Sequence, residues 1–105
     1  MKWYQDYSII LEIFEKHGEL VDEVSFNFKG EPGYIEHYIG YNLQDDEPYW
    51  AGLCDITDGC NFKTAKELFE AKIYNGKSIK ERWNDFVILD ITGIRADDWK
   101  LSEFL

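Results

Sequence analysis

One segment limits the possible folds of this chain more than any other, because its apolar and polar residues alternate strictly. Between residues 23 and 29, polar side chains separate Val24, Phe26 and Phe28, which is the period of a strand that buries one face. A Gly-Glu-Pro-Gly turn follows at residues 30–33, where Pro and Gly suit the central positions of a type II turn. The chain is therefore expected to build a sheet on which helices pack.

Two further strands are predicted after this turn, over residues 34–43 and 49–56. Apolar side chains and His37 share one face of the first, and a loop at 44–48 separates it from the second. A Thr-Asp-Gly sequence at 57–59 is typical of a turn and follows the second strand. These signals predict a three-stranded antiparallel meander.

Helices are predicted on either side of this meander. Over residues 2–17, apolar side chains recur at spacings of three and four, which places them on one face of a helix. Two capping boxes come later, at Thr64–Glu67 and Ser78–Glu81. In each, the hydroxyl can accept a hydrogen bond from the amide three residues on, while the Glu reaches back to the cap amide. They predict two short helices, the second running through Trp83.

Residues 85–93 are predicted to form a final interior strand, because the run Phe86–Leu89 is apolar on both faces. The tail, residues 96–105, carries Trp99 and three other large apolar side chains and is expected to dock on the rest of the chain. Residues 1–105 are thus predicted to form a single domain. Its expected class is α+β, with helices packed on a small, mainly antiparallel sheet of four strands.

The charge of the chain limits its partners. It has 21 Asp and Glu against 11 Lys and Arg, a net charge of −10. Such a charge argues against nucleic acid, whose binding needs Lys and Arg to displace counterions. It favours a basic protein, a cation or simple solubility. No apolar run approaches the length of a membrane span, and no secretory signal is visible, so we expect a cytoplasmic protein without membrane contacts.

The cysteines and one histidine offer the most direct candidate chemistry. Cys54 and Cys60 are expected to be free, partly buried thiols, and their closeness in sequence leaves a bridge open as the alternative. A small-ligand or enzymatic site would combine His37 and Cys54 with Glu36 and Asp55, since a thiolate nucleophile needs a base within hydrogen-bond reach. The cysteine spacing is unusual for zinc, and the acidic loops lack the calcium-loop pattern. We therefore expect no metal, no cofactor and no catalytic residue.

Aromatic and acidic side chains supply the candidate binding surfaces. Tyr34 and Tyr38, with Trp50, would line the sheet face opposite the helices, unless the N-terminal helix or the tail covers that face, which is the favoured expectation. A compact acidic domain suits steered capture of a basic partner, the physical profile of small bacterial immunity proteins and antitoxins that neutralise basic nucleases. A subunit of a larger assembly is a further hypothesis. The predicted partner contacts are Asp45, Asp46, Glu47, Tyr49, Trp50, Asp55 and Asp58.

Overall fold

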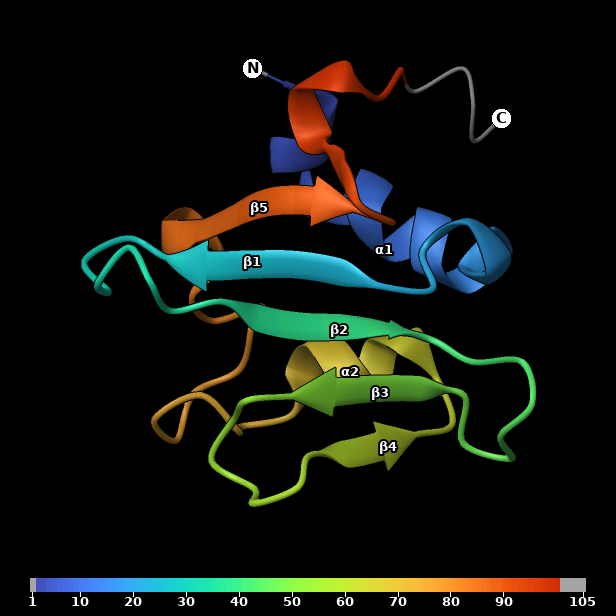
Figure 1. The fold of residues 1–105 in the computed structure, drawn as a ribbon. Coiled ribbons are helices and arrows are strands. Elements are labelled where there is room, and N and C mark those ends of the chain that lie inside the picture. Colours follow the sequence, from blue (N-terminus) through green and yellow to red (C-terminus); the bar gives the residue numbers. More distant parts are fainter. Residues whose placement is uncertain (1, 101–105) are drawn as a thin grey trace.

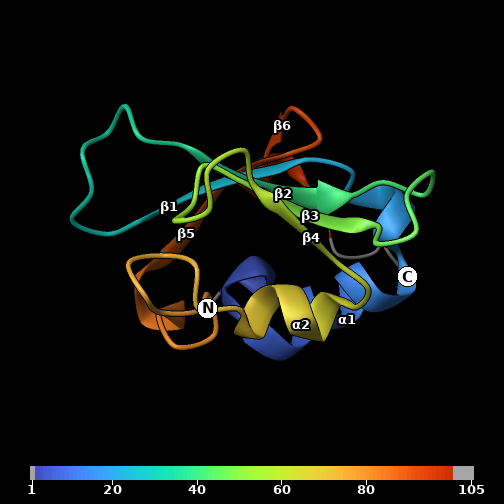
Figure 2. The same cartoon turned by 90° about the horizontal axis from the view of Figure 1, so that it is seen from below.

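The strands form one antiparallel sheet, and both α-helices lie on the same side of it (Figure 1 and Figure 2). The computed structural model describes residues 2–100. The helices are α1 (Tyr7–Lys16) and α2 (Ala65–Glu70), with short 3-10 helices η1 (Trp3–Gln5), η2 (Gly18–Leu20), η3 (Trp83–Asp85) and η4 (Ala96–Asp98). The strands are β1 (Val24–Phe28), β2 (His37–Tyr41), β3 (Tyr49–Gly52), β4 (Cys60–Phe62), β5 (Phe86–Ile91) and β6 (Ile94–Arg95). Their order in the sheet is β4-β3-β2-β1-β5-β6.

The α+β class and the predicted meander are confirmed, but the sheet has six strands, so the prediction of four was wrong. The two additional strands, β4 and β6, are its edges. They have three and two residues, too few to show the alternation by which a strand is recognised in a sequence. Pairing with a neighbour defines them instead, Cys60 with Ala51 and Arg95 with Asp90.

The observed strands are shorter than predicted where the backbone leaves the extended region. β3 ends at Gly52 and not at residue 56, because Leu53 has a φ of 55° and redirects the chain. β2 begins at His37, and Tyr34 lies in the preceding turn with 83% of its surface exposed. A separate turn directly after β1 uses Gly30 at a φ of 93°, which residues with a Cβ rarely adopt.

The predicted N-terminal helix is present, but it begins at Tyr7 and not at residue 2. Asp6 is the reason, since its carboxylate accepts a hydrogen bond from the Ile9 N–H at 3.2 Å and caps the helix. The residues before Asp6 make the single 3-10 turn η1. At the other end, Lys16 complements the helix dipole.

The predicted capping box at Ser78 is present. At Thr64 the hydroxyl caps the helix, but the Glu67 carboxylate accepts from that hydroxyl and not from the cap amide, so this box is incomplete. The Thr64 hydroxyl accepts a hydrogen bond from the Glu67 N–H at 3.1 Å and begins α2. Ser78 and Glu81 exchange two hydrogen bonds of 3.0 Å each. The second box leads through a single turn into η3 and not into a longer helix.

The last strand and the start of the tail behave as predicted. β5 lies between β1 and β6 and is therefore an interior strand. Ala96 is buried, and the Trp99 Nε1–H donates to the Ile91 carbonyl at 2.9 Å, which ties the start of the tail to the end of β5. The other apolar tail residues, within 101–105, lie outside the described residues.

The core lies between the sheet and the two helices. Phe14 of α1 meets Phe69 of α2 edge to face, with ring centroids 5.1 Å apart. Burying a side chain of this size contributes about 1.5–3 kcal/mol. The buried side chains of the strands and helices therefore hold the two layers together. The largest fully buried side chains are Phe14, Phe26, Phe28, Phe69, Ile39, Leu68, Ile79, Ile91, Val21 and Val24.

Candidate functional site

The sheet face opposite the helices is the first candidate surface. In Figure 1 the strands lie in front of both helices, and Figure 2 shows both helices on one side of the sheet. Residues alternate between the two faces along each strand. His37 and Ile39 point into the core, so Tyr38 between them points to the opposite, open face. Strand register places one row of residues across the open face: Gly52, Tyr38, Ser25, Asp90 and Arg95. A second row holds Asn61, Trp50 and Gly40.

The carboxylates of this face gather around Tyr38. Its hydroxyl donates to Glu36 Oε2 at 2.6 Å. This hydrogen bond raises the pKa of Tyr38, and desolvation and the charges of Glu36, Glu23 and Asp90 add to the rise. Carboxylates from three different parts of the chain therefore act on one partly exposed ring. We call the set Glu23, Glu36, Tyr38, Trp50 and Asp90 the acidic sheet face.

Trp50 supplies the apolar part of the acidic sheet face. A Cβ at Gly40, opposite it on β2, would lie 2.6 Å from the indole ring and would overlap the Asp22 carbonyl. Gly40 therefore lets the indole pack directly on the β2 backbone. The ring remains partly exposed, which leaves apolar surface beside the carboxylates.

The expectation that the N-terminal helix covers this face is wrong, because α1 packs on the opposite side with α2. The described part of the tail follows β6 at the edge of the sheet, and residues 101–105 lie outside the described residues, so cover by the tail stays a prediction. Of the predicted aromatic set, Tyr38 and Trp50 lie on the open face. Tyr34 lies outside the strands, in the turn before β2.

The predicted contact charges fall into two separate groups. Asp45, Asp46 and Glu47 are exposed in the loop between β2 and β3. Asp55 and Asp58 follow β3 at its other end (Figure 1). The strand β3 lies between the two groups, so they belong to opposite ends of the sheet.

Two of the predicted contacts have structural roles. Tyr49 is 7% exposed, and its hydroxyl donates to the Phe14 carbonyl at 2.7 Å. Its burial corrects the expectation that it anchors a partner. The Asp55 carboxylate accepts backbone hydrogen bonds from Gly76 at 2.9 Å and Asn75 at 3.0 Å, which lower its pKa. Asp55 therefore holds the turn that precedes the second capping box.

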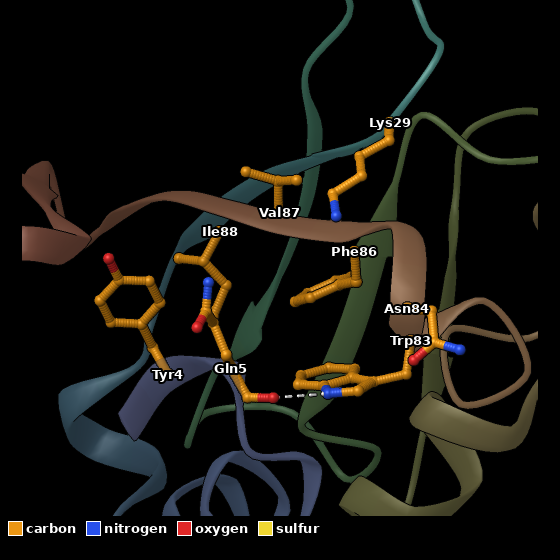
Figure 3. A pocket seen from close by; sticks show the side chains of 8 residues that line it. All are labelled: Tyr4, Gln5, Lys29, Trp83, Asn84, Phe86, Val87 and Ile88. Carbon is orange, nitrogen blue, oxygen red and sulfur yellow. Dashed lines mark hydrogen bonds between the residues drawn. The ribbon is translucent and has the colours of Figure 1, made fainter. Parts of the chain in front are cut away.

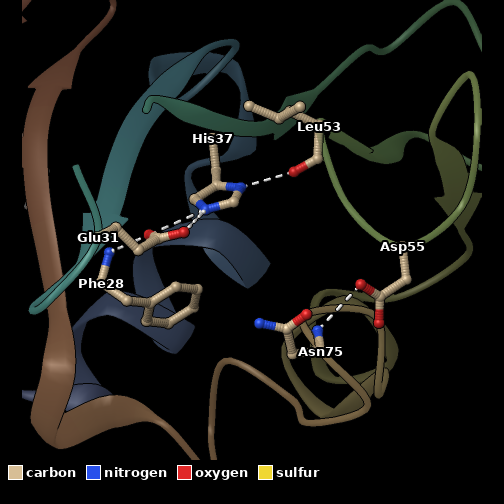
Figure 4. Close-up of polar contacts among 6 residues, drawn as sticks. All are labelled: Phe28, Glu31, His37, Leu53, Asp55 and Asn75. Carbon is tan, nitrogen blue, oxygen red and sulfur yellow. Dashed lines mark hydrogen bonds and ion pairs between the residues drawn. The ribbon is translucent and has the colours of Figure 1, made fainter. Parts of the chain in front are cut away.

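The second candidate site surrounds His37 (Figure 4). The residue is 8% exposed, and its ring stacks on Phe26 with centroids 5.2 Å apart. Nδ1 lies 2.6 Å from the Leu53 carbonyl oxygen, and Nε2 lies 2.9 Å from Glu31 Oε2. Both neighbours are hydrogen-bond acceptors, so the ring is held between the β3 end and the turn before β2.

Glu31 joins this histidine to the turn before β2. Burial opposes its ionisation, but hydrogen bonds from the Phe28 N–H at 2.7 Å and from His37 outweigh it and lower the pKa of Glu31. The Arg82 guanidinium lies 3.8 Å from the centroid of the Phe28 ring and adds a favourable positive charge. The carboxylate thus links β1, the turn and β2.

The structure brings His37, Cys54 and Asp55 to one shallow pocket of about 200 Å³, but it leaves Glu36 outside, on the open face. A general base needs a free ring nitrogen within reach of the group it deprotonates, and both nitrogens of His37 already have partners. The Cys54 thiol instead donates to the Ile56 carbonyl at 3.6 Å. This arrangement fixes the histidine as a structural group between two loops.

A further hollow, of about 240 Å³, lies between η1 and β5 (Figure 3). Trp83 stacks on Phe86 with centroids 4.6 Å apart and donates its Nε1–H to the Gln5 carbonyl at 2.8 Å. Among the residues that line this hollow, Lys29 is the single one with a charged side chain. Tyr4 lines it as well, so Tyr4 and Lys29 are its titratable side chains.

Sequence reasoning missed Glu23, Glu31 and Asp90. The alternation that predicts β1 does place Glu23 on its polar side, but only long-range pairing brings it near Tyr38. Glu31 was read as a turn residue, and Asp90 as part of an apolar strand. Their partners are set by the pairing of β1 with β2 and β5.

Both cysteines are free and partly buried, as predicted. Within residues 2–100, no cluster of three or more His, Cys, Asp or Glu side chains is arranged to hold a metal ion. In the same range, every helix is too short or too polar to cross a membrane. No protein-family model, curated protein or solved structure matches this chain.

Proposed function

We propose that this chain is a protein-interaction domain that binds a basic partner protein through the acidic sheet face. The observation that carries the proposal is the convergence of Glu23, Glu36 and Asp90 on Tyr38, on a face without a described helix. The register places Tyr38 of β2 and Asp90 of β5 on either side of Ser25 of β1, and Glu23 and Glu36 immediately precede β1 and β2. A surface of this kind offers charge and aromatic contact area together.

The net charge of −10 supports a basic partner. A strong field of one sign attracts oppositely charged proteins before contact, which raises the association rate and makes it depend on salt. Tyr38 and Trp50 supply the other half of the interface. Each has an apolar ring with a polar edge, and such residues often carry most of the binding energy at protein interfaces.

The biological form that we propose is inhibition of a basic enzyme, as immunity proteins and antitoxins do. An enzyme that acts on nucleic acid presents Lys and Arg to the phosphates. An acidic protein surface competes for those same charges and can cover the site. The charge of this chain and its partly exposed aromatic rings fit that role.

The test uses the domain as bait in a lysate of its native host, with elution by increasing salt. Three baits are compared: the wild type, a face variant and a loop variant. The face variant carries Glu23→Gln, Glu36→Gln and Asp90→Asn, in which the Gln at position 36 can still accept from Tyr38. The loop variant carries Asp45→Asn, Asp46→Asn and Glu47→Gln and loses the same number of charges.

The proposal predicts a basic protein that the wild type and the loop variant retain and that the face variant releases at lower salt. Equal retention by all three baits would contradict the assigned surface. Loss with the loop variant alone would move the contact to the loop between β2 and β3. Capture of no basic protein by the wild type would contradict the proposed function itself, and capture of a second copy of the chain or of an assembly would favour the subunit hypothesis.

A further inference from the structure

Cys54 and Cys60 stand near the two ends of one short loop, and the backbone beside each is fixed. The residue before Cys54, Leu53, accepts a hydrogen bond from His37 through its carbonyl, and the residue after it, Asp55, donates its N–H to the Ile73 carbonyl at 2.7 Å. Cys60 is the first residue of β4 and pairs with Ala51 of β3. The positions of the two thiols are therefore set by the sheet and the core.

The loop between the cysteines turns back tightly. Gly59 has a φ of 79°, and a Cβ there would overlap the Ala51 carbonyl oxygen, so the chain runs directly against β3 before it enters β4. The Gly59 N–H donates to the Ile56 carbonyl at 3.0 Å and closes the turn. These constraints return the chain to the strand from which it left.

The turn thus brings Cys60 back beside the strand that Cys54 follows. Burial raises the pKa of the Cys60 thiol, and Cys54 lies close enough to add to this rise. Both are partly buried and pack against the core. The Tyr74 hydroxyl is buried without a hydrogen-bond partner among the described residues, and both thiols contribute to the rise of its pKa. A spare donor thus lies close enough to both sulfurs to sense their charge.

We propose that Cys54 and Cys60 are a redox pair that hydrogen peroxide converts into an intramolecular disulfide. In the first step the Cys54 thiol gives up its proton and the thiolate attacks a peroxide oxygen. The O–O bond breaks, the departing hydroxide takes up a proton to become water, and a sulfenic acid remains on Cys54. In the second step the Cys60 sulfur attacks the Cys54 sulfur, the S–S bond forms, and the S–O bond breaks to release a second water. Two electrons pass from the sulfurs to peroxide, and a dithiol reductant reverses the change.

The environment of Cys60 assigns the order of the steps. Burial, together with the neighbouring Cys54, raises the pKa of Cys60 to about 11. This thiol keeps its proton near neutral pH and is a weak nucleophile toward peroxide. Cys54 therefore reacts first and Cys60 resolves the intermediate.

The test treats the folded chain with hydrogen peroxide, then unfolds it and alkylates the remaining thiols before measuring the intact mass. The wild type is expected to lose both alkylated thiols and the mass of two hydrogens, as a monomer, and to recover both on reduction. Cys54→Ser and Cys60→Ser serve as matched variants, each with one thiol. Cys60→Ser is expected to accumulate a sulfenic acid that dimedone traps, because its resolving thiol is absent.

Three results would overturn the redox pair. The wild type could keep both thiols under conditions in which Cys60→Ser is oxidised. It could gain oxygen without losing hydrogen, as independent thiols do. It could also form bridges only between chains. Circular dichroism melting of the three proteins confirms that each is folded, and the readout does not depend on the proposed partner.

Discussion

Replacement of Glu31 by Gln tests the structural role assigned to the His37 cluster. The variant keeps the size of the side chain and an oxygen for the Phe28 N–H, but it removes the charge that faces His37 Nε2. The side chains of Glu31 and His37 are 23% and 10% exposed. The pair is therefore largely shielded from water, and water replaces a lost contact between the two side chains poorly.

The size of the effect follows from the contacts that are lost. Removing one partner of a buried ion pair costs about 3–5 kcal/mol when the other stays charged. Because the Gln oxygen can still accept from His37 Nε2, the expected loss lies below that range, near the value of one hydrogen bond to a charged group, about 1.5–3 kcal/mol. For a domain of about 100 residues, each kcal/mol lowers Tm by about 4–8 °C.

The assay is urea unfolding followed by tryptophan fluorescence, with the m-value checked for constancy. Glu47→Gln is the matched control, since its exposed carboxylate has no hydrogen bond within the described residues. The reasoning is refuted if Glu31→Gln loses less than about 0.5 kcal/mol, the range of ordinary surface substitutions.

The pH dependence gives the same prediction a second check. The pKa of Glu31 is lowered in the folded state, so its stabilisation is fully present above the unfolded value of about 4.3 and is lost as the pH falls through the folded value. The difference in stability between wild type and Glu31→Gln is therefore expected to shrink in acid. A difference that grows in acid would contradict the assignment.

Two substitutions test the packing that positions the acidic sheet face and the helix layer. Gly40→Ala forces a methyl group into the Trp50 ring and is expected to lower the free energy of unfolding in urea by at least about 1–3 kcal/mol. Gly33→Ala is the control, because it has open space around it and should change the stability little. Equal effects of the two substitutions would contradict the contact. Thr64→Ala removes the cap that accepts from the Glu67 N–H and is expected to cost about 1 kcal/mol in the same assay, and an unchanged stability would contradict the cap.

The elements that the sequence predicts well are those whose signal is local. The alternation around Phe26, the hydroxyl cap at Thr64 and the capping box at Ser78 depend on neighbouring residues, and each is present. The edge strands β4 and β6 could not be recognised, because so few residues carry no period and their strand character comes from long-range pairing. The N-terminal helix was predicted to start too early for a related reason. Asp6 is compatible with both a helical position and an N-cap, and the sequence alone does not decide between them.

The candidate site was less predictable than the fold. Tyr38 and Trp50 could be assigned to one face by alternation, but the carboxylates around Tyr38 come from segments far apart in the sequence. Tyr49 was predicted as a contact because it is aromatic and follows an acidic loop, yet its phase on β3 points it to the core. Local chemistry thus suggested an acidic contact surface, and only the register could place it.

The most direct test of the acidic sheet face is photo-crosslinking in the native host. A photoreactive benzoylphenylalanine replaces Tyr38 in one protein and Leu43 in another, where Leu43 is 73% exposed in the loop between β2 and β3. The account predicts that position 38 crosslinks to a basic protein, that added salt weakens the crosslink, and that position 43 does not form it. Crosslinking from position 43 alone, or no basic protein from position 38, would contradict the account.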